Sequence, residues 1–264
     1  MPVAGAAPAR VALVLGGGGC RAHGHIGVIR ALEKNGLKPD LIVGTSAGSL
    51  VGALYAAGLN SAQLETLGQK LGSNPMRDWI FPKLGLFGGK GIRRFITDHI
   101  GERTIESLPI RFAAVSTELR TGKMVVFERG DVGLAVQASS SVPGLIEPLE
   151  IAQKLYVDGS LVAPVPVKVA RSLGADRVVA VDVTFPPEQA TIEGPYDALY
   201  QGFSIVTRRL ALDERVTADL LIAPQLPIHN DMEPATMRAL VEAGEKSALA
   251  ALGQLRTLFA RVPQ

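Results

Sequence analysis

Residues 41–58, LIVGTSAGSLVGALYAAG, decide how this chain folds and where its chemistry is expected. The apolar residues 41–43 predict a buried strand, and the apolar run at 50–57 predicts a helix. Between them lies the pentapeptide Gly44-Thr45-Ser46-Ala47-Gly48. A strand, a tight turn and a helix in succession are the context of a G-x-S-x-G nucleophile elbow, in which the serine lies on a strained corner between glycines. The segment predicts Ser46 as a nucleophile, although so short a motif also arises by chance.

A glycine-rich loop precedes this segment. Residues 10–15 predict a buried strand and residues 24–35 a helix that stops at Gly36. The loop between them contains Gly17, Gly18, Gly19, Cys20, Arg21 and Ala22. Consecutive glycines let backbone N–H groups converge on one point, and the adjoining helix N-terminus favours negative charge there. The loop is therefore a candidate anion-binding site.

Two functions compete for this loop. It satisfies G-x-G-x-x-A, a dinucleotide-binding fingerprint that also requires an acidic residue at the end of the second strand to hold a ribose. Here Asp40 precedes that strand, and Ser46 stands where the acid is required. The interpretation we favour is an oxyanion hole, in which the loop amides stabilise the tetrahedral intermediate of acyl transfer.

A carboxylate follows another short apolar segment. Residues 155–157 predict a strand that runs into Asp158, Gly159 and Ser160. An Asp at the carboxyl end of a strand points into the crevice where doubly wound sheets bind ligands. Asp158 is therefore a candidate general base for Ser46. Asp-Gly is also a common turn dipeptide, so the pair has a purely structural interpretation as well.

Histidine is poorly supplied for a triad. The chain order Ser, Asp, His requires a histidine after Asp158, and only His229 qualifies, in a segment typical of a surface loop. His25 is expected to pack at the start of a helix. The sequence therefore favours a two-residue arrangement of Ser46 and Asp158. It contains no convincing cluster of His, Cys or carboxylates at ligand spacing, so no metal site is predicted.

The rest of the chain continues to alternate strands and helices. We expect helices at 62–71 (capped by Ser61), 92–100, 131–140 (capped by Asp131), 165–173, 196–213 and 233–261, and strands at 111–116, 123–127, 177–183 and 219–223. The opening β-α-β-α order is the signature of a parallel, doubly wound sheet. Nothing marks a boundary, so residues 1–264 are predicted to form one domain, with the motifs within about 11–183 and residues 196–261 packed on them.

Residues 72–91 break this alternation with prolines, aromatics and glycines, and predict a loop or mobile cap over residues 73–91. Between Trp79 and Phe95, apolar residues stand beside basic ones, which suits transient contact with an anionic membrane surface. The interpretation we favour is a loop folded over the sheet, with its aromatics in the core and its charges in water, because the stretch is not an obvious amphipathic helix.

The composition narrows the class of protein. The chain has 27 basic and 25 acidic residues without a long run of one sign, which argues against nucleic acid as a partner. Its single cysteine, Cys20, excludes internal disulfides and is compatible with a reducing compartment. The sequence shows no run of 18 apolar residues and no signal peptide. We therefore expect a cytoplasmic protein that can also contact a membrane surface peripherally.

Four motifs, in chain order, resemble the patatin-like phospholipase family. They are Gly17-Gly18-Gly19-Cys20-Arg21 with His25-Ile26-Gly27-Val28 after it, Gly44-Thr45-Ser46-Ala47-Gly48, Ala138-Ser139-Ser140-Ser141-Val142-Pro143-Gly144, and Asp158-Gly159 with Pro164-Val165-Pro166 beyond. The similarity runs from about Val11 to Val183. Four ordered motifs are far more specific than any one of them.

The resemblance implies a three-layer α/β/α sandwich with a mostly parallel central sheet and a Ser–Asp dyad that needs no cofactor. It implies that Ser46 attacks an acyl ester of a lipid, that Asp158 takes and returns the proton, and that amides around residues 17–19 stabilise the oxyanion. Arg21 is expected to fix the loop or to add positive potential. Phospholipid, lysophospholipid and short-chain ester remain open as substrates. A nucleotide-binding oxidoreductase and a weakly active regulatory protein are the alternatives.

Two residues depart from the family pattern. Ala22 stands where the family usually has Gly, and Ser160 where it has Gly or Ala. Neither change removes a reacting group. Cys20, at a position that is usually small, is interpreted as a buried filler thiol and not as a nucleophile.

Overall fold

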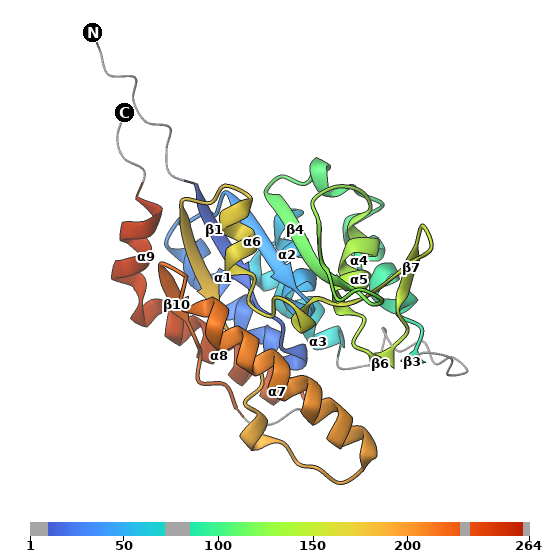
Figure 1. Ribbon diagram of the computed structural model, residues 1–264. Helices are drawn as coiled ribbons and strands as arrows, with labels where there is room; N and C mark the ends of the chain where they lie inside the picture. Colours follow the sequence, from blue (N-terminus) through green and yellow to red (C-terminus); the bar gives the residue numbers. More distant parts are fainter. Residues whose placement is uncertain (1–9, 72–84, 228–232, 261–264) are drawn as a thin grey trace.

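The computed structural model describes residues 10–71, 85–227 and 233–260 (Figure 1). Its centre is a sheet in the order β10-β9-β1-β2-β4-β8-β7, with β5 paired to β4. The strands are β1 (Val11–Leu15), β2 (Leu41–Thr45), β4 (Arg111–Glu118), β5 (Met124–Phe127), β7 (Leu149–Ile151), β8 (Lys154–Asp158), β9 (Arg177–Val181) and β10 (Leu220–Ile222). Neighbours among β10, β9, β1, β2 and β4 pair in parallel, whereas β5, β7 and β8 pair antiparallel. A separate parallel pair joins β3 (Gly85–Phe87) to β6 (Gly144–Ile146).

Helices cover both faces of this sheet. They are α1 (His23–Lys34), α2 (Ala47–Ala56), α3 (Ser61–Leu71), α4 (Lys90–Ile100), α5 (Val132–Ser140), α6 (Val167–Ser172), α7 (Pro195–Arg215), α8 (Pro234–Ala250) and α9 (Leu252–Phe259), with 3-10 turns η1 (Gly19–Ala22), η2 (Ile105–Ser107), η3 (Gly159–Leu161) and η4 (Pro187–Gln189). Figure 1 shows α6 in front of the strands and α1 behind them. The predicted three-layer α/β/α sandwich is therefore confirmed.

The strand sequences explain the two cores. Successive side chains of a strand point to opposite faces. In β1, Leu13 and Leu15 join the core beneath α1, α2 and α8, while Ala12 and Val14 join the core beneath α6. A strand buried on both faces must be apolar throughout, which is why these segments read as continuous apolar runs and not as alternating ones.

The predicted elements match the structure closely, with informative exceptions. The hairpin expected from 111–116 and 123–127 forms as β4 and β5, and Asp131 caps α5 by accepting a hydrogen bond from the amide of Leu134. The prediction that Ser61 caps α3 is wrong. Asn60 Oδ1 accepts from the amide of Gln63, and Gln63 Oε1 accepts from the amide of Asn60, so these two residues form the cap.

The long helix predicted at 233–261 is two helices. The chain leaves helical geometry at Ala251, with φ −96° and ψ 11°, and α9 begins at the next residue. The break lets α9 bury Leu255 completely and brings the carbonyl oxygens of Leu258 and Ala260 to the guanidinium of Arg177. These are tertiary contacts, and the local sequence gives no stop signal for them.

The segment predicted as a loop or cap lies partly outside the described residues, which resume at residue 85. Residues 85–87 are the strand β3, which the sequence does not predict because these three residues stand in a glycine-rich stretch typical of a loop. In α4, Ile92 and Phe95 are buried while Arg93 and Arg94 are exposed. For the described part, this agrees with apolar side chains in the core and charges in water. Within the described residues, no helix combines the length and hydrophobicity of a transmembrane span.

Candidate active site

Ser46 occupies the corner between β2 and α2. Its φ of 53° and ψ of −131° lie in a region that L-residues rarely adopt, at a cost of about 1–3 kcal/mol. The flanking glycines are required by space, since a Cβ at Gly44 would lie 2.5 Å from Ser49 Cα and one at Gly48 would lie 2.2 Å from the carbonyl oxygen of Leu15. The start of α2 therefore selects glycine at position 44, and packing of α2 over the end of β1 selects glycine at position 48.

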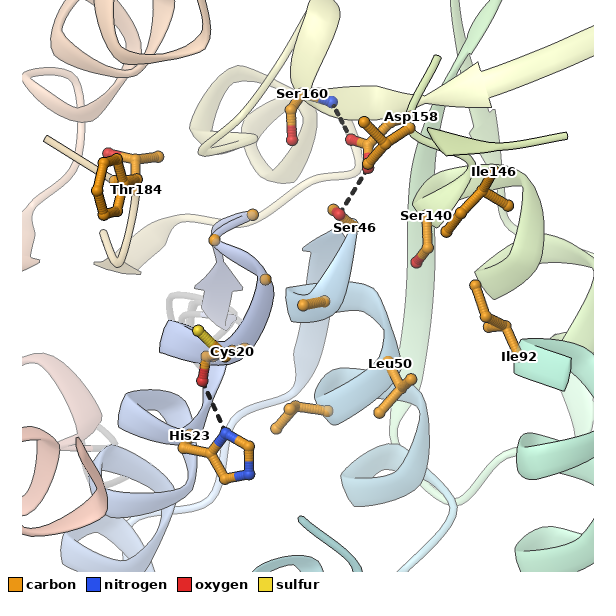
Figure 2. A pocket seen from close by; sticks show the side chains of 18 of the residues that line it. Cys20, His23, Ser46, Leu50, Ile92, Ser140, Ile146, Asp158, Ser160 and Thr184 are labelled. Carbon is orange, nitrogen blue, oxygen red and sulfur yellow. Dashed lines mark hydrogen bonds between the residues drawn. The ribbon is translucent and has the colours of Figure 1, made fainter. Parts of the chain in front are cut away.

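The hydroxyl of Ser46 donates to Asp158. Its Oγ lies 2.6 Å from Asp158 Oδ2, and both residues are buried (Figure 2). The sheet register brings them together, because Thr45 pairs with Val115 and Asp158 pairs with Ser116, the next residue of β4. The sequence prediction put Asp158 at the end of a strand of a parallel sheet. In the structure β8 is antiparallel to β4 and runs back along its C-terminal end, so Asp158 still reaches the sheet edge at which Ser46 lies.

The environment of Asp158 tunes it for proton transfer. Burial raises the pKa of Asp158 to about 6, against the opposing effect of the hydrogen bonds from Ser46 Oγ and from the Ser160 amide to Oδ1. A carboxylate with a pKa near neutrality can both accept and return a proton. The pair therefore has the geometry and the acidity that an activated serine requires.

The amides of the glycine loop divide into two groups. The Gly17 amide donates to the carbonyl oxygen of Pro164 at 2.9 Å, and the Arg21 amide donates to that of Gly18 at 3.1 Å. Among the described residues, the amides of Gly18 and Gly19 have no acceptor, and both residues line the cavity that contains Ser46. A Cβ at Gly17 would lie 2.5 Å from Ser160 Oγ, so a larger residue at this position would have to displace the Ser160 hydroxyl.

Arg21 ties the loop to its surroundings. Its Nε donates to the carbonyl oxygen of Val183 and its Nη1 to that of Pro227, both at 3.1 Å, and the guanidinium lies 5.7 Å from the ring centroid of Phe185. With its side chain enclosed in this way, Arg21 holds the chain after β9 against the glycine loop.

The two departures from the family pattern are sterically accommodated, and the interpretation of Cys20 needs correction. Ala22 is buried in η1, and Ser160 packs against Gly17. Cys20 is only half-buried and lines the cavity near Ser46, so it is not an enclosed filler (Figure 2).

The described histidines make other contacts than Ser46. His25 is fully buried, its Nε2 donates to the carbonyl oxygen of Gly16 at 2.8 Å, and burial lowers its pKa to about 4. His23 Nδ1 donates to the carbonyl oxygen of Cys20, and His99 Nδ1 to that of Phe95. His229 lies outside the described residues. His25 thus packs at the start of α1, as predicted.

A cavity of about 660 Å³ opens over the Ser46–Asp158 pair. Its walls are largely apolar and, among the described residues, come mainly from the helices α1, α2, α3, α4 and α7. Contributing residues include Ile26 of α1, Leu50 and Leu54 of α2, Leu64 and Leu67 of α3, Ile92 and Phe95 of α4, and Tyr200 and Phe203 of α7. Sequence reasoning missed the contribution of α7, although Tyr200, Phe203 and Thr207 share one helical face. Among the described residues, no group of three or more His, Cys, Asp or Glu side chains is placed to hold a metal ion.

Two serines of α5 also belong to the site. Ser139 Oγ accepts from the Ser46 amide at 2.9 Å and donates to the carbonyl oxygen of Val115 at 2.6 Å, which fixes the elbow to β4. Ser140 lines the cavity beside it. Both serines lie in the motif at residues 138–144, but that motif alone indicates no role for either of them.

Fold and site together define a class: α/β proteins in which a serine on a strand–helix corner donates to a buried aspartate at the edge of a mostly parallel sheet. A family model described as patatin-like phospholipase matches residues 13–171. The chain therefore belongs to the patatin-like phospholipase family.

Relatives extend this assignment. An uncharacterised NTE family protein of Mycobacterium tuberculosis is 36% identical over 184 residues, which cover 69% of this chain and 51% of that protein. Patatin-like phospholipase domain-containing protein 6 of Mus musculus is 33% identical over 208 residues, covering 76% of this chain and 15% of that protein. The match thus spans about half the length of the mycobacterial relative, and less of the mouse protein.

Solved structures share the fold. VipD from Legionella pneumophila superimposes with a TM-score of 0.56 at 14% identity, covering 94% of this chain and 67% of VipD. ExoU from Pseudomonas aeruginosa, in its heterodimeric complex with SpcU, gives a TM-score of 0.55 at 18% identity and covers 97% and 53%. At these identities the likeness concerns the fold alone.

Proposed function

We propose that this protein is a serine acyl hydrolase that cleaves carboxylic esters of lipids, with Ser46 as nucleophile and Asp158 as general base. The observation that carries the proposal is the 2.6 Å hydrogen bond from Ser46 Oγ to Asp158 Oδ2 within a largely apolar cavity. Membership of the patatin-like phospholipase family supports the same activity.

The reaction uses a covalent intermediate. Asp158 accepts the hydroxyl proton as Ser46 Oγ bonds to the ester carbonyl carbon, and the carbonyl oxygen becomes an oxyanion. The C–O bond then breaks, Asp158 returns the proton to the departing alcohol, and the acyl group remains on Ser46. Water repeats the sequence with Asp158 as base and releases the free acid. The complete reaction consumes one water molecule per ester and needs neither a metal nor a redox cofactor.

We assign the oxyanion hole to the amides of Gly18 and Gly19. The Gly17 amide already donates to Pro164, whereas the next two are without an acceptor among the described residues. Amides fixed in this way stabilise the charge that develops in the transition state, an effect typically worth about 3–4 kcal/mol per donor. Gly17, Cys20 and Arg21 then shape the loop, with the arginine side chain holding it in place.

The walls of the cavity favour a lipid substrate. Apolar side chains of α1, α2, α3 and α4 surround the serine, and a hydrocarbon chain buried against them gains about 0.8 kcal/mol per CH₂ group. The acyl chain is therefore expected to contribute most of the binding free energy. The ester and its alcohol then meet the polar groups around Ser46.

A fluorophosphonate probe tests the proposed activity. We expect the purified protein to be labelled and to hydrolyse acyl esters, and Ser46→Ala to lose both, because the probe reacts only with an activated serine. Asp158→Asn should lower ester hydrolysis by about 10²-fold or more through loss of the general base. Ser107→Ala, a change at an exposed serine of η2, is the matched control and should behave as wild type.

Two outcomes would contradict this assignment. Unchanged hydrolysis by Ser46→Ala would exclude the serine mechanism and revive the nucleotide-binding alternative for the glycine loop. Loss of activity in His229→Ala together with full activity in Asp158→Asn would replace the dyad with a histidine base.

A further inference from the structure

Three consecutive serines lie at the C-terminal end of α5, namely Ser139, Ser140 and the C-cap residue Ser141. Their hydroxyls differ in whether they are hydrogen bonded within the protein. Ser139 Oγ donates to the carbonyl oxygen of Val115, and Ser141 Oγ donates to that of Gln137 at 2.9 Å. Ser140 Oγ is buried but has no hydrogen-bond partner among the described residues. The middle hydroxyl is therefore the unsatisfied one.

An unpaired buried hydroxyl is costly, by about 1–3 kcal/mol. Ser140 is 8% exposed, and it lines the same cavity as Ser46 and Asp158. Figure 2 shows Ser140 beside Ser46, toward Ile92 and Ile146, with Cys20 on the other side of Ser46. A polar group left unpaired at this place is expected to find its partner in a molecule that enters the cavity.

The substrate offers few candidate atoms. In the proposed reaction the carbonyl oxygen faces the amides of Gly18 and Gly19, in the loop that includes Cys20, across Ser46 from Ser140. The ester oxygen receives its proton from Asp158, and an acyl chain has no polar atom. What remains is an additional oxygen on the alcohol portion of the ester.

We propose that the Ser140 hydroxyl binds a second oxygen of the alcohol portion and so selects esters of polyhydroxy alcohols, such as glycerol, over simple alkyl esters. This inference rests on the proposed function and deepens it by naming the class of alcohol. The hydroxyl can donate to an ether or ester oxygen and can accept from a hydroxyl, so it recognises either kind of glycerol oxygen. It adds no chemical step to the reaction.

Two matched substrates test this specificity. A 1-monoacylglycerol and the ethyl ester of the same fatty acid, in the same detergent micelles, differ only in the alcohol. We expect Ser140→Ala to lower kcat/KM for the monoacylglycerol about tenfold, the effect of one lost hydrogen bond, and to change that for the ethyl ester less than twofold. Fluorophosphonate labelling of Ser46 at the wild-type rate checks that the elbow is intact.

Ser141→Ala is the matched control. It removes a hydroxyl from the same helix end that is already bonded within the protein, so it should affect both esters equally. An equal loss on both esters in Ser140→Ala, or no loss on either, would overturn the role of Ser140 while leaving the proposed function standing. Wild-type protein that hydrolyses neither ester and resists the probe would overturn the proposed function itself, and this inference with it.

Discussion

The carboxyl group of Asp158 is buried, and the groups that hydrogen bond to it are a hydroxyl and an amide. Among the described residues it has no ion pair. Burial disfavours its charged form and raises its pKa to about 6. In the proposed reaction this pKa, which is close to that of a histidine, lets Asp158 serve as the base in place of the histidine of a Ser–His–Asp triad.

The pH dependence of activity should report this acidity. Because Asp158 acts as base only when ionised, kcat/KM is expected to rise with pH through about 6 and to stay level from about 7 to 8. Each pH unit well below 6 should cost about tenfold, since the ionised fraction falls by that factor. Initial rates of ester hydrolysis in buffers of constant ionic strength measure the profile. An ascending limb that persists unchanged in Asp158→Asn would assign the titration to another group.

At the scale of elements, α1 and α8 approach each other unusually closely. A Cβ at Gly27 would lie 1.9 Å from the carbonyl oxygen of Val241, and one at Gly244 would lie 2.0 Å from that of Gly24. An ion pair between Arg30 and Glu245 adds to the contact. The glycine inside α8, which weakens a helix by itself, is thus explained by the backbone of α1. The glycine loop and η1 lead directly into α1, so the contact between α1 and α8 helps to hold the glycine loop in position.

Gly27→Ala should therefore destabilise the protein. The added methyl group has no space, and overpacking of this kind costs about 1–3 kcal/mol or more. Gly202→Ala in α7 is the matched control, because a Cβ there meets nothing within 4 Å and alanine is the better helix former. Urea unfolding monitored by circular dichroism should show a lower midpoint for the first variant and an equal or higher one for the second. Equal midpoints for Gly27→Ala and wild type would show that the helices can move apart without cost.

At the scale of the molecule, a buried carboxylate joins the sheet to α7, one of the helices that line the cavity. Asp182 follows β9, and its side chain is 1% exposed. It accepts from Arg208 Nη1 at 3.0 Å, from Arg215 Nη1 at 2.7 Å and from Thr184 Oγ1 at 2.6 Å. Since both arginines belong to α7, this cluster fixes that helix on the sheet and with it the α7 side chains that line the cavity.

Asp182→Asn should loosen this arrangement. Loss of this carboxylate leaves two arginine charges without their partner, but because these side chains are 27% and 20% exposed the cost should be below the roughly 3–5 kcal/mol of a fully buried pair. We expect a lower melting temperature and a raised KM for acyl esters, because α7 shifts. The change in kcat should be smaller, because Ser46 after β2 and Asp158 at the end of β8 keep their positions. Asp213→Asn, at an exposed position of α7, is the control. An unchanged KM in folded Asp182→Asn would contradict the coupling between this cluster and the cavity.

Much of the fold was readable from the sequence, because parallel strands buried on both faces must be continuously apolar and their helices amphipathic. The strands around residues 11–15, 41–45 and 177–181 and the elbow between β2 and α2 carry that local signal. The three-residue strands β3, β6 and β7 carry none, since each is adjacent to or begins with glycine or proline, which indicates a loop. The break at Ala251 likewise depends on the burial of Leu255 and on the hydrogen bond from Arg177 to the carbonyl oxygen of Leu258, not on the residues beside it.

The same division holds for the site. Local sequence patterns were enough to identify the candidate groups, namely Ser46 on a glycine-flanked corner, Asp158 after a strand, and a glycine loop before a helix, because each pattern depends on a few adjacent residues. The three-dimensional packing was needed to show that Ser46 and Asp158 lie 2.6 Å apart, that α7 lines the cavity, and that, among the described residues, the Gly17 amide is occupied while the Ser140 hydroxyl has no partner. Those facts depend on strand register and on packing between segments more than 90 residues apart, which no local pattern encodes.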